Sequence, residues 1–181
     1  MLEIAIFIGA EGWDEEKEEF LPAPVQVLHL EHSLVSLRNW EAKWQKPFLS
    51  RESKTDEEAL DYIRLMTLDP GVDPVIYNHL SAENIDAINK YIDSPMTATT
   101  FTEDKNGRRS REIITAEILY YWMIALNIPF ECQYWHLNSL LSLIKVCNIK
   151  NQPPKKMSKK DIMSRNARLN AARRQQLNSK G

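Results

Sequence analysis

The sequence predicts a mainly helical α+β fold: a small N-terminal antiparallel sheet packed on a helical bundle, with a basic C-terminal helical tail. Two short apolar runs rich in β-branched residues open the 181-residue chain, and a helical period replaces them from Ser33 onward. The apolar period stops at Pro153-Pro154, and the following residues are strongly basic. We therefore expect one α+β domain over residues 1–152 and a flexible or partly helical tail over residues 153–181.

Two strands are expected at the start of the chain. Leu2–Ile8 is a short, mainly apolar run with β-branched residues, and Val25–Glu31 alternates apolar and polar side chains as a half-buried strand does. Gly9–Pro24 contains glycine and proline and is expected to be the loop between them. An antiparallel pair is the natural arrangement, and the Thr-rich segment Met96–Thr102 is expected to add an extended edge.

The first helices are predicted from their capping residues. Ser33 is the expected N-cap of a helix that Pro47 terminates, and Thr55 with Glu58 forms a capping box at the start of the next helix. A short turn of helix is then expected from Asp73-Pro74 to His79, and Ser81 is the expected cap of a further helical segment that ends before Pro95.

Two apolar helices are expected to form the centre of the core. Arg111–Leu126 follows the predicted cap Ser110, and Phe130–Ile149 follows Pro129. Because only a few residues connect them, we expect antiparallel neighbours. Their aromatic residues are interpreted as core: Tyr120, Tyr121, Trp122, Tyr134 and Trp135.

Charge is divided unevenly along the chain. Residues 153–181 contain nine Lys and Arg residues and one acid, Asp161, whereas residues 1–152 contain 14 basic and 24 acidic residues. The overall net charge of −2 therefore combines an acidic domain with a basic tail, which suggests a charged partner. No apolar run reaches the roughly 20 residues of a membrane span, and Cys132 and Cys147 lie in apolar helical pattern, so we expect a reduced protein of the cytosol.

We expect no catalytic residue, no metal site and no cofactor. On a strand, His29 and Glu31 share one face and His32 lies on the other, so these side chains do not converge on a metal ion. Cys132 and His136 are four residues apart and are interpreted as core. The chain has no HExxH, CxxC, GxGxxG, GxxxxGK[ST] or GxSxG pattern, and the expected function is therefore not enzymatic.

Three aromatic residues are the first candidates for partner binding. Trp40 and Trp44 are four residues apart on one helix face, and Phe48 lies just beyond. They fit either the core or a partner-facing patch, and we predict the patch because aromatic side chains commonly anchor protein interfaces.

The tail provides the second group of candidates, Arg165, Arg168, Arg173 and Arg174. A basic segment of this kind fits three interpretations: a solubilising tail, a helix that folds on an acidic protein, or a phosphate-binding arm. Because residues 153–181 contain no aromatic residue for base stacking, nucleic acid is the less expected partner.

Four segments together resemble a known family. They are HSLVSLRNWEAKWQKPFLS (His32–Ser50), KTDEEALDYIRLMT (Lys54–Thr67), NGRRSREIITAEILYYWMIALNIPFECQYWHLNSLLSLIKVCNIKNQPPKKM (Asn106–Met157) and SRNARLNAARRQQLNSKG (Ser164–Gly181). This chain resembles, over nearly its whole length beyond residue 25, small proteins of tailed double-stranded DNA bacteriophages, some of which are tail assembly chaperones.

The resemblance implies a protein that keeps the long, helical tape measure protein soluble until tail-tube subunits polymerise around it. The implied partners are the tape measure protein and the tail-tube protein, the implied location is the host cytoplasm during infection, and no catalytic or metal-binding residue is implied. Two alternatives remain open: a structural tail or baseplate component located in the virion tail, and a nucleic-acid-binding protein acting through the basic tail. A homo-oligomer remains open as well.

Overall fold

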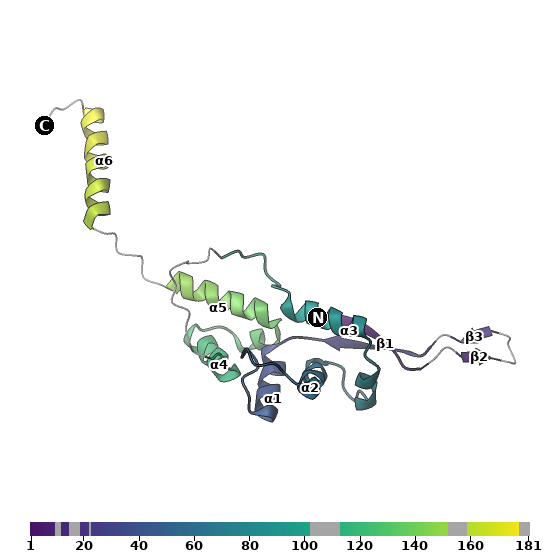
Figure 1. The fold of residues 1–181 in the computed structure, drawn as a ribbon. Coiled ribbons are helices and arrows are strands. Elements are labelled where there is room, and N and C mark those ends of the chain that lie inside the picture. Colours follow the sequence, from purple (N-terminus) through teal and green to yellow (C-terminus); the bar gives the residue numbers. More distant parts are fainter. Residues whose placement is uncertain (10–11, 15–18, 22, 102–112, 152–158, 178–181) are drawn as a thin grey trace. The chain divides into compact units, whose positions relative to one another are not determined.

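The computed structural model describes residues 1–9, 12–14, 19–21, 23–101, 113–151 and 159–177. The chain divides into two compact units, Met1–Asn148 and Ile149–Gly181. The first unit combines a two-stranded antiparallel sheet with helices (Figure 1), and the second contains one long helix. The predicted mainly helical α+β fold is therefore confirmed.

Strands β1 (Leu2–Phe7) and β4 (Val25–Leu30) form the predicted antiparallel pair. The register places Leu2 opposite Leu30 and Phe7 opposite Val25. One face of the pair is buried and carries Ile4, Ile6, Leu28 and Leu30. Successive strand side chains point to opposite faces, which explains why Phe7, Val25 and Val27 are exposed.

Both strands of this sheet also form hydrogen bonds with residues outside the pair. In β4, the His29 carbonyl accepts from the Leu68 N–H at 2.8 Å, and an isolated bridge joins Leu30 to Thr67. In β1, the Ala5 carbonyl accepts from the Asn84 side-chain amide at 3.1 Å. These bonds connect the sheet to Thr67 and Leu68 on one side and to Asn84 on the other.

A second pair of strands lies where a loop was predicted. Strands β2 (Gly12–Asp14) and β3 (Glu19–Leu21) pair antiparallel, with Trp13 opposite Phe20. The prediction of a continuous loop over Gly9–Pro24 was therefore wrong. Three residues per strand are too few to give a recognisable alternation, so the sequence contains no clear signal of this pair.

The next four helical segments begin at the predicted capping residues. They are α1 (Leu34–Trp44), α2 (Asp56–Met66), the 3-10 helix η1 (Pro74–His79) and α3 (Ala82–Asp93). The Ser33 hydroxyl accepts from the Ser36 N–H at 3.2 Å, and Thr55 and Glu58 form the predicted capping box. Local capping chemistry therefore fixes where these segments start.

The two helices expected at the centre of the core are shorter than predicted. Helix α4 covers Ala116–Ala125; residues 113–115 before it are not helical, and the predicted cap Ser110 lies outside the described residues. Phe130–Ile149 is not one helix but the 3-10 helix η2 (Phe130–Tyr134) followed by α5 (Leu137–Asn151).

Pairing with the start of α1 interrupts the helical pattern between η2 and α5. His136 forms an isolated antiparallel bridge with Ser33, and the Leu137 N–H donates to the His32 carbonyl at 2.7 Å. The backbone is already extended at Trp135, directly after the last residue of η2, Tyr134. A tertiary contact thus overrides the local helical preference of this segment.

Helix α1, rather than the α4–α5 pair, lies at the centre of the core. Leu34, Leu37 and Trp40 are almost completely buried, and α1 packs against α2, α4 and η2. Residues 96–101 form no strand, so the predicted extended edge is not part of a sheet; Thr102 lies outside the described residues. Ser139 and Asn138 instead bind the carbonyls of Met96 and Ser94, both at 2.7 Å.

The second unit contains α6 (Lys159–Leu177), which agrees with the predicted helical tail. All of its described side chains are exposed to solvent. Few of its residues are large and apolar: Ile162, Met163, Leu169 and Leu177. A helix that is polar on nearly all sides has little apolar surface to bury. Such a helix is only marginally stable in water without a surface to pack on.

Candidate protein-binding surface

The predicted aromatic patch on α1 is mostly part of the core. Trp40 is 1% exposed, and its Nε1–H donates to the Glu58 carbonyl at 2.9 Å. Phe48 is 8% exposed; its ring lies 5.1 Å from Trp40 and 4.0 Å from Tyr62, centroid to centroid. The prediction that these two residues face a partner was therefore wrong, because α2 and the chain after α1 cover that helix face.

Trp44 is partly buried and is bonded to α2. Its Nε1–H donates to the Asp61 carboxylate at 2.9 Å, and Lys43 forms an ion pair with the same carboxylate at 2.6 Å. The indole of Trp44 therefore helps to hold α1 against α2. Trp44 retains some exposed surface, but it does not form a patch with Trp40 and Phe48.

A different set of aromatic residues is exposed. Five large side chains on α4, on η2 and directly after η2 are between 49% and 65% exposed, and we call them the aromatic surface: Tyr121, Ile124, Phe130, Tyr134 and Trp135. Tyr121, Tyr134 and Trp135 were interpreted as core from the sequence, and that interpretation was wrong. Tyr120 and Trp122 are partly buried against the core, as expected.

The aromatic surface rests on a well-packed base. Leu119, Met123 and Cys132 are buried beneath it. Tyr120 links its two elements, because its hydroxyl donates to the Gln133 side-chain oxygen at 2.9 Å and its ring lies 6.5 Å from that of Phe130. A rigid base lowers the entropic cost of presenting these rings to a partner.

The signal that could have identified this surface is Glu117. It lies four residues before Tyr121 and is exposed, so the two share one face of α4. Because α4 is apolar on nearly every side, hydrophobic periodicity gives no indication of which face is buried. The one charged residue near its start marks the face in contact with solvent.

The histidines weighed as metal ligands in the sequence form hydrogen bonds within the fold. His32 is buried, and its Nδ1 lies 2.6 Å from the Tyr62 hydroxyl. Burial, and secondarily the nearby His136, lowers the pKa of His32 to about 3. His136 Nε2–H donates to the Tyr91 carbonyl at 3.0 Å, while its Nδ1 accepts from the Asn138 N–H at 3.2 Å. Burial likewise lowers the pKa of His136, so both rings are neutral at neutral pH.

Across the described residues, no group of three or more His, Cys, Asp or Glu side chains could hold a metal ion. His29 lies apart from the buried pair and bonds to Asp69 through Nδ1 at 2.8 Å. Cys132 is buried, and desolvation raises the pKa of its thiol. Within the described part of the chain, no helix is long and apolar enough to cross a membrane.

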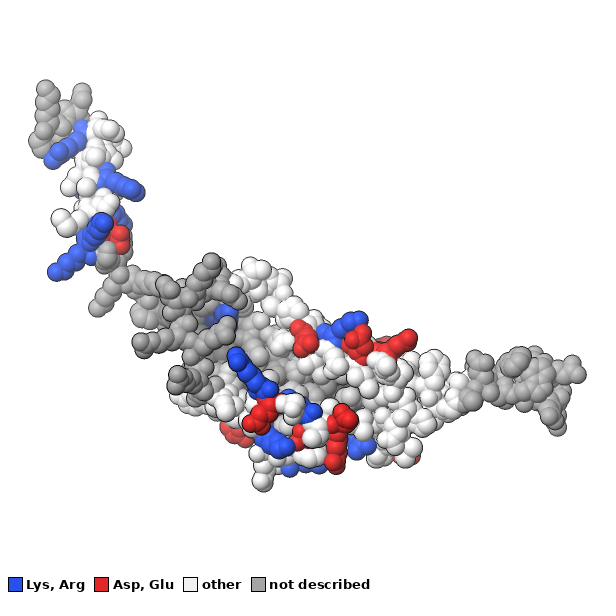
Figure 2. All heavy atoms as spheres, viewed as in Figure 1, with Lys and Arg blue, Asp and Glu red and all other residues white. Residues whose placement is uncertain are grey.

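The candidate arginines of the tail all lie on α6. Arg165, Arg168, Arg173 and Arg174 are exposed, and Lys and Arg side chains project from more than one side of the helix (Figure 2). At about 100° per residue these four positions do not share one face. The helix therefore carries a diffuse positive charge rather than a single basic stripe.

The chain matches no family model, and no curated protein and no solved structure is significantly similar to it.

Proposed function

We propose that this chain is a non-enzymatic binding protein whose partner docks on the aromatic surface of α4 and η2. The observation that carries the proposal is the exposure of Tyr121, Ile124, Phe130, Tyr134 and Trp135 on a buried, well-packed base. Tyrosine and tryptophan bury a large area for the loss of few rotatable bonds, which makes them effective interface anchors.

The resemblance of the sequence to tail proteins of bacteriophages suggests the partner. We propose a tail assembly chaperone that binds the tape measure protein, tail-tube subunits or both, in the host cytoplasm during infection. A long helical partner with apolar side chains would be protected from aggregation while those side chains cover the aromatic surface. The basic helix α6, through Arg165, Arg168, Arg173 and Arg174, is proposed to bind acidic segments of the same partner.

Pull-down from infected cells tests the aromatic surface. The double variant Tyr121→Ser/Trp135→Ser should recover less tape measure protein than the unmodified chain, because two anchors are removed from the interface. Val75→Ser is the matched control, since Val75 is 57% exposed on η1, outside the aromatic surface. Equal recovery with the double variant and the control would overturn the assignment of this surface.

Mass spectrometry of purified particles separates the chaperone from the structural alternative. A chaperone should be absent from the finished particle, whereas a tail or baseplate component should be present in a stoichiometric amount. Nucleic-acid binding would show itself as an affinity that falls steeply with salt concentration.

A further inference from the structure

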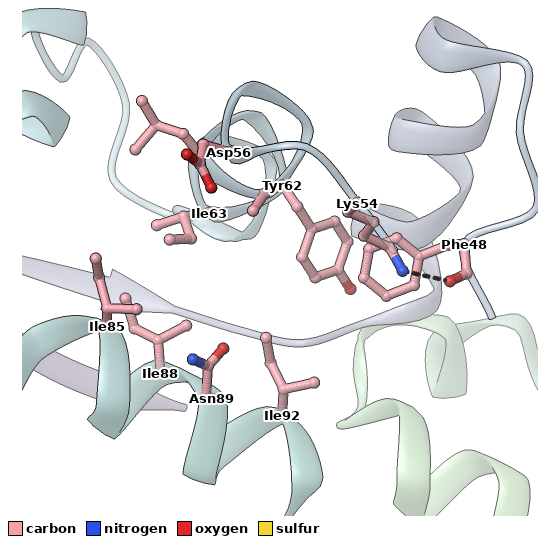
Figure 3. Close-up of a pocket in the computed structure, with 11 residues that line it drawn as sticks. Phe48, Lys54, Asp56, Tyr62, Ile63, Ile85, Ile88, Asn89 and Ile92 are labelled. Carbon is pink, nitrogen blue, oxygen red and sulfur yellow. Dashed lines mark hydrogen bonds between the residues drawn. The ribbon is translucent and has the colours of Figure 1, made fainter. Parts of the chain in front are cut away.

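A groove of about 500 Å³ lies between α2 and α3 (Figure 3). Phe48 and Tyr62 line it on the side of the core. Its remaining apolar lining comes from both helices: Ala59, Leu60, Ile63, Ile85, Ile88 and Ile92. The polar side chains that line it are Lys54, Asp56 and Asn89. An apolar groove of this size with a few polar groups is typical of sites for small ligands.

Lys54 provides a cation at one end of the groove. Its Nζ donates to the Phe48 carbonyl at 2.8 Å and lies 4.2 Å from the centroid of the Phe48 ring. No described carboxylate lies within ion-pair distance of this ammonium. Because an ammonium group has three N–H donors and the structure assigns one to Phe48, Lys54 retains capacity for a further acceptor.

The nearby acids form no ion pair with Lys54, although the charge of Glu58 acts on it from a longer distance. The Glu58 carboxylate binds Lys46 through Oε1 at 2.5 Å and the Thr55 N–H through Oε2 at 2.9 Å. Asp56 lies toward the other end of the groove from the Lys54 ammonium in Figure 3. Desolvation by burial lowers the pKa of Lys54, and the negative charge of Glu58 partly opposes this shift.

We propose that the α2–α3 groove binds an amphiphile with a single carboxylate head, held by Lys54, and an unbranched alkyl chain lying along the isoleucines of α2 and α3. The volume of about 500 Å³ lies within the range of about 300–1,000 Å³ that is typical of pockets for small ligands. The carboxylate would supply a second acceptor for the Lys54 ammonium, beside the Phe48 carbonyl. This site is separate from the aromatic surface, and the inference does not depend on the proposed function.

The charge of the groove favours a monocarboxylate over a phosphate head. One ammonium can compensate one negative charge, whereas a dianion held by Lys54 would leave a net negative charge in the field of Glu58. The Glu58 carboxylate disfavours additional negative charge in a partly desolvated site. Asn89, whose amide lies between Ile88 and Ile92 in Figure 3, can bond to the polar end of a shorter ligand.

Titration of the full chain with decanoate, followed by NMR of isoleucine methyl groups, tests the proposal. We expect saturable shifts of the Ile85, Ile88 and Ile92 methyl groups. The neutral probe decan-1-ol has the same chain length, and we expect decanoate to bind about tenfold more tightly. Equal affinity of the two probes, shifts confined to residues of α4 and η2, or no saturable binding of decanoate would each overturn the proposal.

Three variants locate the head and the chain of the ligand. Lys54→Met should reduce decanoate affinity about tenfold while leaving decan-1-ol affinity unchanged. Lys90→Met is the matched control, because Lys90 is an exposed lysine of α3 paired with Asp86, and it should change neither affinity. Ile85→Trp, which fills the groove and keeps Lys54, should abolish binding of both probes. Decanoate affinity that is unchanged in Lys54→Met, or binding that persists in Ile85→Trp, would contradict the site.

Discussion

The Glu41 carboxylate of α1 accepts a hydrogen bond from the backbone N–H of Ala116, the first residue of α4, at 2.7 Å. Its other oxygen accepts from the Phe48 N–H at 2.8 Å. Thr115, the residue at the N-cap position of α4, provides no side-chain cap to the helix. A side chain 75 residues earlier in the sequence thus replaces the local cap and places a negative charge at the positive end of the helix.

Replacement of Glu41 by alanine should therefore lower the free energy of unfolding by about 3 kcal/mol. Two buried N–H donors would lose their acceptor, and hydrogen bonds to charged groups are among the stronger ones. Urea unfolding monitored by circular dichroism measures the effect. Glu57→Ala, at an exposed position in the first turn of α2, is the control and should change stability by less than about 0.5 kcal/mol. Similar losses in the two variants would show that the Glu41 contacts contribute little.

Two aromatic substitutions should separate folding from binding, because one should lower stability and the other should weaken partner binding. Trp40→Ala should cost about 3–5 kcal/mol of stability, because it opens a cavity in the core and removes the hydrogen bond to Glu58. Tyr121→Ala should change stability by less than about 0.5 kcal/mol and weaken partner binding. Thermal unfolding of both variants measures their changes in stability. A large loss of stability in Tyr121→Ala would mean that this ring is packed rather than exposed.

Acid should destabilise the fold through His32. Its pKa is about 3 in the folded state, whereas an unfolded histidine titrates near 6.5, so the unfolded state binds more protons between these values. The stabilisation is complete above about pH 6.5 and is lost as the pH falls toward 3. At pH 5 the loss from His32 alone should be about 2 kcal/mol, and the lowered pKa of His136 acts in the same direction.

Urea unfolding at pH 7 and pH 5 measures this dependence, with His32→Gln as the comparison. The variant should show a smaller difference between the two pH values, whatever its stability at pH 7. An equally large difference would assign the acid sensitivity to other groups.

Removal of the chain after Asn151 should leave the first unit folded. The side chains of α6 are exposed, so their loss should change the unfolding free energy of the rest by less than about 0.5 kcal/mol. Partner recovery in a pull-down should fall, because the four arginines are removed. Unchanged recovery would exclude α6 from the interface while leaving the aromatic surface as the binding site.

Local signals predicted most of the first half of the fold. Ser33, Thr55 and Ser81 act within one helical turn, so the starts of α1, α2 and α3 follow from the sequence around them. The start of α5 depends instead on the pairing of His136 with Ser33, about 100 residues away along the chain. No local pattern indicates a contact of that kind.

The candidate binding residues were predicted less well than the helices, and the reason is specific. Trp40 and Tyr121 both lie in helices rich in large apolar residues, where spacing alone does not say which face is covered. Coverage of Trp40 depends on α2 and on Phe48, whereas the Tyr121 face has no covering element among the described residues. The groove at Lys54 also required the structure, because α2 and α3 form it together.

The hydrogen bonds at the margins of the β1–β4 sheet limit how copies of this protein could associate. The Leu68 N–H donates a hydrogen bond to the His29 carbonyl, and the Asn84 side-chain amide donates one to the Ala5 carbonyl. An incoming strand from another molecule would have to displace these contacts before it could extend the ladder. Assembly by edge-to-edge strand addition is therefore disfavoured at these positions of the sheet.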